Sequence, residues 1–417
     1  MTNTAIAVIG ANYGDEGKGL ATDFFTRKLN APLVARCNGG SQAGHTVQTE
    51  DKRHVFGHVG SGAFAGAATY LSEAFIINPI MLRKELGELK TRQTIFASPQ
   101  CRVSTIYDMA INSLIELKRG VERHGSCGMG INETVTRHAA GFHLTADMIK
   151  PNASYAPTPR NDYLLERVEN IRDRWVPMRI LELGISRDDF NAGGQLYFDM
   201  LKMSAEKVTE ELLYNSEYFH LNDPKDFLKD RTLIVEGAQG LMLDEFLGEF
   251  PHVTRSVTGL ASSIRAAAEC GKTKIQPIYM SRSYFTRHGA GELLYEGLKI
   301  TDKELETDHT NVLNPWQGEI RYAPLNLHEM SWFIREDMKR AQYVAQVFGV
   351  EIKPPKLFIT CMDQLGENVN IVSRNKEILK MKTIKLVSYI EKVMSMEVYA
   401  TSHGPTANDV QIRQAVL

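Results

Sequence analysis

The 417-residue sequence has no long apolar run, no basic block and no paired cysteines. No stretch approaches the about 18 consecutive apolar residues of a membrane-spanning helix, and the N-terminal MTNTAIAVIG lacks the basic start and cleavage site of a secretory signal. The five cysteines are scattered without a C-x-x-C pair, which is typical of reduced thiols. The net charge is −2, without the basic clusters of nucleic-acid-binding proteins. We therefore expect a cytoplasmic protein that binds neither membranes nor nucleic acids.

Apolar runs of strand length alternate with segments of helical periodicity along most of the chain. This alternation predicts an α/β fold with a large, mostly parallel β-sheet flanked by helices. The expected strands are Ala5–Gly10, Leu33–Cys37, Thr69–Ile77, Thr94–Ala97, Thr232–Glu236, Lys274–Tyr279, Lys356–Thr360 and Glu397–Thr401. The expected helices are Leu20–Leu29, Met81–Leu89, Ile106–Lys118, Gln195–Tyr214, Leu260–Glu269, Leu327–Phe348 and Thr383–Met394. Since no internal repeat or linker interrupts the pattern, we expect one domain over residues 1–417, with loop insertions such as Ile149–Arg160 and Glu304–Gly318.

The first expected strand leads into GANYGDEGKGLATDFF, which starts at Gly10 and has the strand, glycine turn and helix of a phosphate-binding loop. A Walker loop places Ser or Thr after its Gly-Lys pair. Here Gly19 follows Lys18, so the hydroxyl that holds Mg²⁺ is missing. Asp15 could replace that hydroxyl as a Mg²⁺ ligand, or act as a base toward a second ligand beside the γ-phosphate. Alternatively, Asp15 and Glu16 only cap the N-terminus of a helix.

A second glycine-rich loop, NGGSQAGHT from Asn38 to Thr46, follows the next expected strand. Because the carboxyl ends of parallel strands line one crevice, we expect His45 to lie near Asp15. A histidine in a glycine loop at a strand end favours a ligand contact over a purely structural role. The two loops thus predict one shared site that combines phosphate binding, an acid and an imidazole.

The two loops together resemble the paired signatures of the adenylosuccinate synthetase superfamily. The likeness continues in family order through GSCGMGI (from Gly125), VEGAQGLMLD (Val235), FPHVT (Phe250), SYFTRHGAGE (Ser283) and TSHGPTANDV (Thr401). The resemblance implies the family's fold, a homodimer and a Mg²⁺-dependent carbon–nitrogen ligase of purine biosynthesis. In the family reaction, a nucleoside triphosphate phosphorylates the 6-oxygen of a purine nucleoside monophosphate. The amine of L-aspartate then displaces that phosphate.

The resemblance also implies roles for individual residues. Asp15 would remove the N1 proton of the purine and bind Mg²⁺ together with the carbonyl of Gly44. His45 would donate to the 6-oxygen and to the transferring phosphoryl group, Gln239 would orient the purine, and Arg321 would bind the carboxylate of aspartate. Besides Asp15, Gly44 and His45, nucleotide-binding roles are implied for Glu16, Gly17, Lys18, Gly19, Thr46, Asp363, Gly404 and Pro405. Substrate-binding roles are implied for Asn38, Gln42, Ser126, Cys127, Gln239, Thr254, Asn311, Gln317 and Arg321, with Arg137 reaching the monophosphate of the neighbouring subunit.

Three segments depart from the family pattern. Ser126-Cys127 stands in place of the threonine pair that grips the monophosphate, so one hydroxyl contact is lost. WQGEIR, which ends at Arg321, stands in place of Thr-Thr-Gly-Arg-Arg-Arg, so Glu319 replaces an arginine that faces the ribose hydroxyls and the aspartate. The base-reading motif Thr-Lys-Leu-Asp becomes TCMD, so Cys361 replaces the lysine over the base while Asp363 is retained. The phosphoryl donor is therefore ATP or dATP, or GTP as in other members of the family.

The segments DHTNVLNPWQGEIR (from Asp308) and GPTANDVQIR (from Gly404) are most similar to a viral branch of the family, N6-succino-2-amino-2'-deoxyadenylate synthase. That branch joins aspartate to dGMP, a step toward the 2-aminoadenine DNA of bacteriophages, and would place the protein in host cytoplasm. Asp15 argues against membership of the viral branch, because typical members of that branch have a non-acidic residue at this position. We predict dGMP as the purine. The alternatives are an ordinary synthetase that uses IMP and GTP, and a non-catalytic nucleotide-binding module, which would give His45, Gln239 and Arg321 no role.

Overall fold

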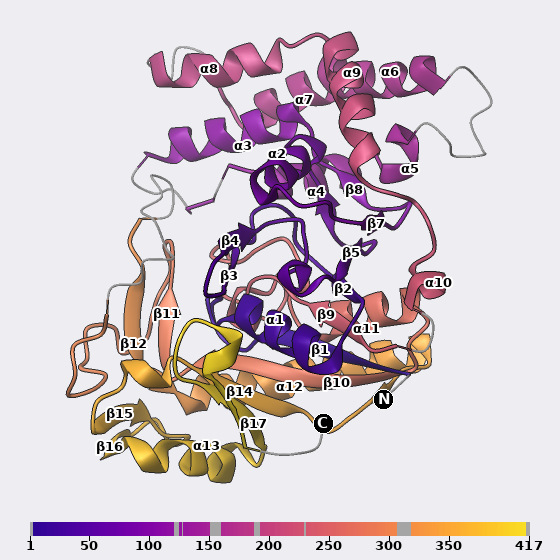
Figure 1. The fold of residues 1–417 in the computed structure, drawn as a ribbon. Coiled ribbons are helices and arrows are strands. Elements are labelled where there is room, and N and C mark those ends of the chain that lie inside the picture. Colours follow the sequence, from indigo (N-terminus) through magenta and orange to yellow (C-terminus); the bar gives the residue numbers. More distant parts are fainter. Residues whose placement is uncertain are drawn as a thin grey trace.

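The computed structural model describes residues 3–120, 125–126, 128–150, 160–186, 192–228, 231–306 and 318–413 (Figure 1). Its strands are β1 (Thr4–Gly10), β2 (Leu33–Arg36), β3 (His45–Gln48), β4 (Arg53–Phe56), β5 (Ala68–Leu71), β6 (Ile76–Ile77), β7 (Ile95–Ala97), β8 (Arg102–Val103), β9 (Leu233–Glu236), β10 (Lys274–Arg282), β11 (Tyr284–Arg287), β12 (Arg321–Asn326), β13 (Glu351–Ile352), β14 (Lys356–Thr360), β15 (Asn368–Val372), β16 (Ile378–Lys382), β17 (Val398–Ser402) and β18 (Val410–Ile412). Its α-helices are α1 (Lys18–Leu29), α2 (Pro79–Leu89), α3 (Ile106–Arg119), α4 (Ile131–Ala139), α5 (Ala146–Ile149), α6 (Arg160–Asn170), α7 (Val176–Glu182), α8 (Ala192–Leu201), α9 (Ala205–Asn215), α10 (Pro224–Leu228), α11 (Leu260–Glu269), α12 (Leu327–Phe348) and α13 (Leu386–Met394). None of these helices is long and apolar enough to cross a membrane.

A ten-stranded sheet forms the centre of the described chain (Figure 1). The strand order is β18-β17-β14-β10-β1-β9-β2-β5-β7, and β13 pairs with β10. Every pair in this sheet is parallel except β17 with β18. The α/β class and the mostly parallel sheet predicted from the sequence are therefore confirmed.

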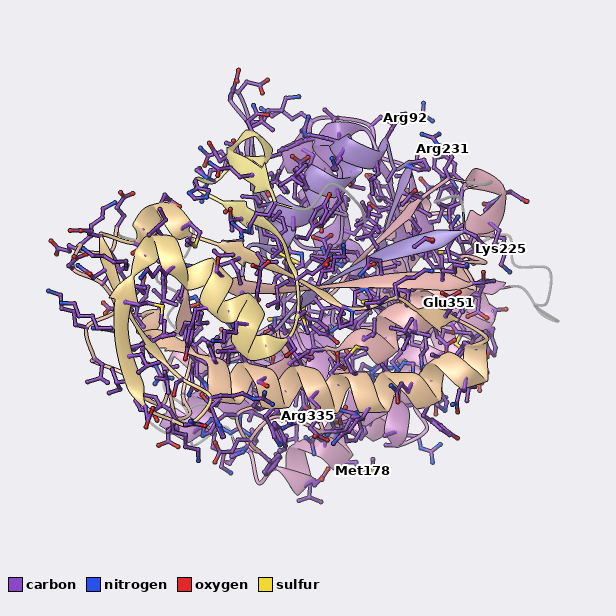
Figure 2. All side chains as sticks on the ribbon, turned by 90° about the horizontal axis from the view of Figure 1, so that it is seen from below. Arg92, Met178, Lys225, Arg231, Arg335 and Glu351 are labelled. Atoms are coloured by element: carbon purple, nitrogen blue, oxygen red, sulfur yellow. The ribbon has the colours of Figure 1, made fainter. Side chains whose placement is uncertain are left out.

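The central strand β1 is buried on both faces, which is why its sequence is apolar at nearly every position. Ala5 and Ile9 belong to a core that includes side chains of α11 and α12. Ile6 and Val8 point to the opposite face and pack with side chains of α1. The sheet is thus the middle of three layers. Figure 2 shows α12 running along one face, with the exposed Arg335 on it.

A second core lies beyond the β7 side of the sheet, where α3, α6, α7, α8 and α9 pack together (Figure 1). Trp175 and Tyr107 are fully buried there, and a π-helical turn, Ile171–Trp175, joins α6 to α7. A smaller sheet, in the order β11-β12-β15-β16, lies near β14 and β17. Neither the second core nor the smaller sheet occupies the carboxyl edge of the main sheet, where the connecting loops lie.

Most predicted elements are confirmed, and α11 and α12 have the predicted bounds. Two predictions are wrong. Thr69–Ile77 is not one strand, because the chain turns after β5, with the Phe75 N–H donating to the Ser72 carbonyl at 2.9 Å. Gln195–Tyr214 is not one helix, because the Ser204 hydroxyl accepts the Lys207 N–H and starts a new helix, α9. The predicted loops Ile149–Arg160 and Glu304–Gly318 lie mostly outside the described residues.

Candidate functional site

The loops after β1, β2, β9, β10, β14 and β17 meet at the carboxyl edge of the main sheet. Contacts between them are direct. The Arg282 Nε donates to the carbonyl of Asp15 at 2.5 Å, and the Thr360 hydroxyl donates to the carbonyl of Glu16 at 3.0 Å. The site is therefore built from segments that are far apart in the sequence.

Gly19 brings the first two loops into contact. A Cβ atom at this position would lie 2.7 Å from the carbonyl oxygen of Thr46, closer than real Cβ atoms come. The glycine that breaks the Walker pattern is thus required by packing, because a Ser or Thr would collide with the backbone of the second loop. Helix α1 begins at Lys18, directly after Gly17, which has a φ of 85° and supplies no side-chain cap. The uncapped N–H groups of α1 are available to a phosphate.

Glu16 occupies the first loop itself. Its Oε1 accepts the N–H groups of Asn12 (3.0 Å) and Gly14 (2.9 Å), and its Oε2 lies 2.7 Å from the ammonium group of Lys18. Both side chains are almost completely buried. Gly10 leaves room for this arrangement, since a Cβ there would lie 2.5 Å from Oε2 of Glu16. The described chain therefore carries its own anion among the donors of the loop.

Asp15 has a left-handed backbone, with φ of 60°, and a partly exposed carboxylate. Its Oδ2 lies 3.2 Å from Nε2 of His288. Burial acts to raise the pKa of Asp15, but the hydrogen bond and charge of His288 and the charges of Arg282 and Lys18 outweigh it and hold the pKa below its usual value. Asp15 is therefore ionised at neutral pH and able to accept a proton or bind a cation.

His45 is buried at the start of β3 and forms a pair with Glu236 at the end of β9. The distance from Nδ1 to Oε1 is 2.6 Å. Glu236 also accepts from the N–H and hydroxyl groups of Ser61. Although burial raises the pKa of Glu236, the charges of His45 and Arg36 and these hydrogen bonds hold it at about 2. Burial and the charges of Arg36 and Lys18 lower the pKa of His45 and together outweigh the opposite effect of Glu236, so the imidazole is neutral and donates through Nδ1, which leaves Nε2 for a ligand.

Gln42 and Gln239 lie on the loops after β2 and β9. Both polar atoms of the Gln42 side chain are buried, and they have no hydrogen-bond partner in the part of the chain that the structure describes. Such an unpartnered amide is a candidate ligand contact. Gln239 has a φ of 64°, and its neighbour Gly240 approaches the first loop so closely that a Cβ would lie 2.2 Å from the carbonyl of Asn12. These contacts fix the Gln239 backbone against the phosphate-type loop.

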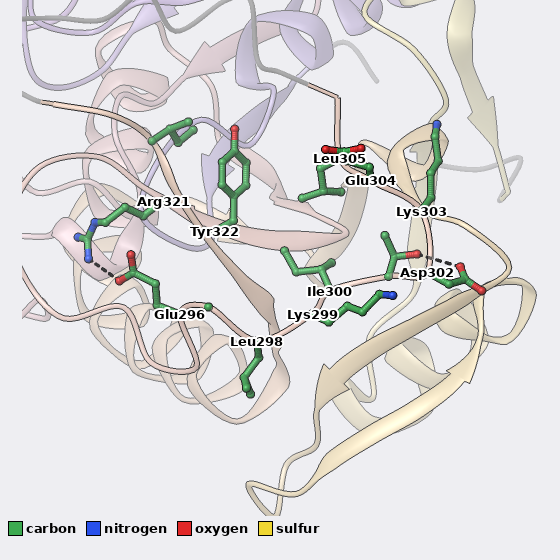
Figure 3. A pocket seen from close by; sticks show the side chains of 13 residues that line it. Glu296, Leu298, Lys299, Ile300, Asp302, Lys303, Glu304, Leu305, Arg321 and Tyr322 are labelled. Atoms are coloured by element: carbon green, nitrogen blue, oxygen red, sulfur yellow. Dashed lines mark hydrogen bonds and ion pairs between the residues drawn. The ribbon is translucent and has the colours of Figure 1, made fainter.

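Arg321 begins β12 and lies at one end of a cavity of about 710 Å³ (Figure 3). Its Nη2 donates to the carbonyls of Gly289 and Gly291, each at 2.8 Å. Its Nη1 lies 2.8 Å from Oε2 of Glu296, which also lines the cavity. The guanidinium is thus held from behind by two carbonyls and faces a carboxylate.

Three comparisons relate this site to known proteins. The family model of adenylosuccinate synthetase matches residues 7–312. The chain belongs to the adenylosuccinate synthetase family. The adenylosuccinate synthetase of Borrelia duttonii (strain Ly) is 31% identical over 307 residues, which cover 70% of this chain and 64% of that protein. That of Psychrobacter sp. (strain PRwf-1) is 30% identical over 364 residues, which cover 83% and 75%. The match thus spans less than two thirds of the length of the Borrelia relative.

Two solved structures share the fold. The fully ligated adenylosuccinate synthetase of Plasmodium falciparum has a TM-score of 0.69 at 17% identity and covers 98% of this chain and 100% of that one. Cyanophage S-2L succinoaminodeoxyadenylate synthetase, bound to dGMP and to dATP as an energy donor, has a TM-score of 0.58 at 14% identity and covers 98% and 95%. At these identities the two structures support the family's fold and nothing finer.

Arg137 does not lie where its expected role in the family would require. The side chain is fully buried, with Nε and Nη2 bound to the Asp108 carboxylate at 2.9 and 3.0 Å. Two further donors, on Nη1 and Nη2, reach the carbonyls of Phe142 and Val103, both at 2.7 Å. The guanidinium therefore joins α4 to α3 and β8 inside one chain, and the prediction that it reaches a neighbouring subunit is not consistent with this placement.

Other predicted residues have structural partners. The Asn38 amide binds both the N–H and the carbonyl of Ala238, at 2.8 and 3.2 Å, and so links the loops after β2 and β9. The Ser126 hydroxyl accepts from Asn112 at 2.8 Å, and Thr254 donates its N–H to the Leu243 carbonyl. Gly44, Gly404 and Pro405 lie on exposed or half-buried loops, and Asp363 is half-buried after β14. The predicted residues Cys127, Asn311 and Gln317 lie outside the described residues.

Sequence reasoning missed Glu236 and His288. Both lie within motifs that were noticed, VEGAQGLMLD and SYFTRHGAGE, directly at a strand end and directly after one. An ionisable residue at the carboxyl end of a buried parallel strand is the signal that would have identified Glu236. His288 follows β11, which pairs antiparallel with β12, so that signal does not apply to it.

Proposed function

We propose that this chain is a ligase that joins L-aspartate to the 6-position of a purine nucleoside monophosphate, through a 6-phosphoryl intermediate formed from a nucleoside triphosphate. The observation that supports this most is the direct packing of a phosphate-type loop carrying Asp15 against a loop carrying His45, which Glu236 holds. A nucleotide switch would have no use for this imidazole. In this pair the Asp15 carboxylate can act as a base toward the N1 proton of a 6-oxopurine, and the imidazole can donate to its 6-oxygen.

In this proposal Asp15 accepts the N1 proton of the purine, which makes the 6-oxygen nucleophilic. Glu236 holds the His45 ring, and Nε2 faces the 6-oxygen and the phosphoryl group. When negative charge develops on the 6-oxygen and the phosphoryl group, the ionised Glu236 stabilises a protonated His45 ring. The uncapped N-terminus of α1 and Lys18 hold the triphosphate. Lys18 has to exchange Glu16 for phosphate oxygens.

The side chain of Asp15 is also of the chemical type that binds a magnesium ion. It is an ionised, partly exposed carboxylate, and Mg²⁺ prefers one or two such oxygens together with substrate phosphates. The carbonyl of the exposed Gly44 is the second proposed ligand. When bound, the ion would neutralise charge on the transferring phosphate.

For the phosphoryl donor we propose ATP or dATP over GTP. Asp363 is the residue that would accept two hydrogen bonds from guanine. Its Oδ2 already accepts from the Gln364 amide at 2.7 Å, so within the described residues only Oδ1 is without a hydrogen bond. Cys361 further removes the lysine that would pack over the base. GTP remains the alternative, as in the ordinary synthetases.

For the purine we propose dGMP, with IMP as the alternative. Glu319 in place of an arginine removes a partner for the ribose hydroxyls, and the cyanophage neighbour is bound to dGMP. The relatives' name, adenylosuccinate synthetase, and the retained Asp15 favour IMP. We also propose a homodimer, without a role for Arg137 at the partner's site.

The test is a competition with equal dGMP and IMP, together with Mg²⁺, ATP and L-aspartate. We expect a 2-amino-N6-succinyl deoxynucleotide as the main product by mass spectrometry. A pool dominated by adenylosuccinate would reject dGMP and leave the ligase proposal intact. Triphosphate hydrolysis that does not depend on aspartate, without a succinylated product, would reject the ligase.

A further inference from the structure

The cavity beside Arg321 contains an ion pair that no proposed step uses. Residues 296–305 and 320–322 line it, and Figure 3 shows Glu296 and Arg321 facing each other at one end. Lys299 and Lys303 also line the cavity, closer to its other end. Asp302 and Glu304 line it too, so the cavity as a whole is not cationic, and a carboxylate would be recognised at Arg321 itself.

The guanidinium of Arg321 has only one terminal nitrogen left for a carboxylate. Two hydrogens of Nη2 are directed to the carbonyls of Gly289 and Gly291. The carboxylate of Glu296 is bound to Nη1. Nη1 carries two hydrogens, and Glu296 accepts one of them. A carboxylate that approaches Nη1 from the side of Glu296 must therefore compete with Glu296 for that hydrogen.

The ion pair is weak enough to be displaced. The Arg321 side chain is 26% exposed and that of Glu296 is 41% exposed, so water screens both charges. The two carbonyls hold the guanidinium independently of Glu296. Removal of the Glu296 charge would thus leave a preorganised, unpaired cation in the cavity.

We propose that Glu296 is an internal competitor of the amino-acid substrate for Arg321, and so sets the affinity of the site for aspartate. This inference rests on the proposed function and on the role that the resemblance implies for Arg321, which is to bind the carboxylate of the aspartate substrate. The competition multiplies the KM for aspartate by the reciprocal of the fraction of time that Nη1 is free of Glu296. It does not act on the phosphoryl transfer, so kcat is independent of it.

The variant Glu296→Gln keeps the size of the side chain and removes its charge. We expect its KM for L-aspartate to fall about two- to fivefold, the range set by an exposed ion pair, with kcat unchanged. Succinate, which has both carboxylates and no amine, is expected to become a better competitive inhibitor by the same factor. The matched control is Glu304→Gln, which lines the same cavity and has no ion pair with Arg321 among the described residues.

Two further variants separate the possible failures. Arg321→Leu should raise the KM for aspartate strongly and leave the affinity for the monophosphate nearly intact. Glu296→Gln added to Arg321→Leu should have no further effect, since the competition requires both partners. If Arg321→Leu leaves the KM unchanged, the proposed aspartate site is wrong. If Arg321→Leu raises the KM but Glu296→Gln leaves it unchanged or raises it, only the competitor role of Glu296 is rejected.

Discussion

At the scale of single residues, the site depends on how closely two backbones approach. Gly19 is a glycine because the Thr46 carbonyl occupies the space of its side chain, and Gly10 is one because the Gln239 carbonyl would lie 2.5 Å from a Cβ at that position. The sequence displayed both glycines but gave no reason for them. Such reasons are contacts between loops distant in the chain, which no local pattern contains. The same holds for Glu236, whose partner His45 is 191 positions away.

Gly19→Ser restores the Gly-Lys-Ser ending of a Walker loop and tests whether this contact matters. We expect a loss of at least about 10²-fold in turnover, because the added Cβ forces the second loop and His45 away from the first. Steady-state kinetics with saturating substrates measure it. The control is Gly87→Ser on α2, where a Cβ would meet nothing within 4 Å. Normal turnover of Gly19→Ser, with the structure unchanged, would show that the contact has no importance.

At the scale of elements, prediction worked where a segment carries its own signals. Helix α12 has the predicted bounds because Asn326 caps its first turn and Gly349, with φ of 65°, ends it. Prediction from the sequence failed where an element is determined by a residue far away in the chain or by a single polar residue, as at Ser204 between α8 and α9. The order of the ten strands could not be read at all, since the pairing of β1 with β9 and β10 joins segments more than 220 residues apart.

Asp337 of α12 provides a test of how α11 is held. Its carboxylate accepts the Leu260 N–H at the start of α11 and the hydroxyl of Tyr279. Burial, only partly offset by these bonds, raises the pKa of Asp337 to about 6. Between about pH 4 and 6 the folded chain therefore binds a proton that the unfolded chain has lost, so its free energy of unfolding falls as the pH rises.

Asp337→Asn removes this titration. Relative to the wild type, we expect the free energy of unfolding of the variant to rise by about 2 to 3 kcal/mol between pH 4 and pH 7. Urea unfolding at several pH values measures it, with Glu336→Gln on the neighbouring, more exposed position as the control. A difference between wild type and Asp337→Asn that stays constant with pH would contradict the raised pKa.

At the scale of the whole molecule, ligand binding and stability are linked, because the loops that form the site come from both ends of the described chain. Positions from Gly10 to Pro405 contribute to one edge of one sheet. A ligand that bridges these loops stabilises the entire fold, by about 2.7 kcal/mol at a hundred times its Kd. The melting temperature is therefore a readout of nucleotide choice.

Thermal unfolding with Mg²⁺ and ATP or GTP tests the proposed donor. At equal concentrations we expect ATP and dATP to raise the melting temperature more than GTP, because Gln364 already occupies one oxygen of Asp363. Gln364→Ala should narrow the difference by freeing that oxygen for guanine. A larger shift with GTP in the wild-type protein would reject the ATP assignment.

The position of β1 in the sheet also determines how late in synthesis β1 can pair with its neighbouring strands. Its two neighbours, β9 and β10, begin at Leu233 and Lys274, so the ribosome must add some 230 to 270 residues before either edge of β1 can pair. At typical elongation rates of 5 to 20 residues per second, this takes roughly 12 to 55 seconds. During that interval Ala5–Ile9, the most apolar strand of the centre, emerges without a partner. The nascent chain thus exposes an aggregation-prone apolar segment during much of its synthesis. The yield of folded protein in a cell should therefore depend on chaperone supply and translation speed more than on the stability of the finished fold.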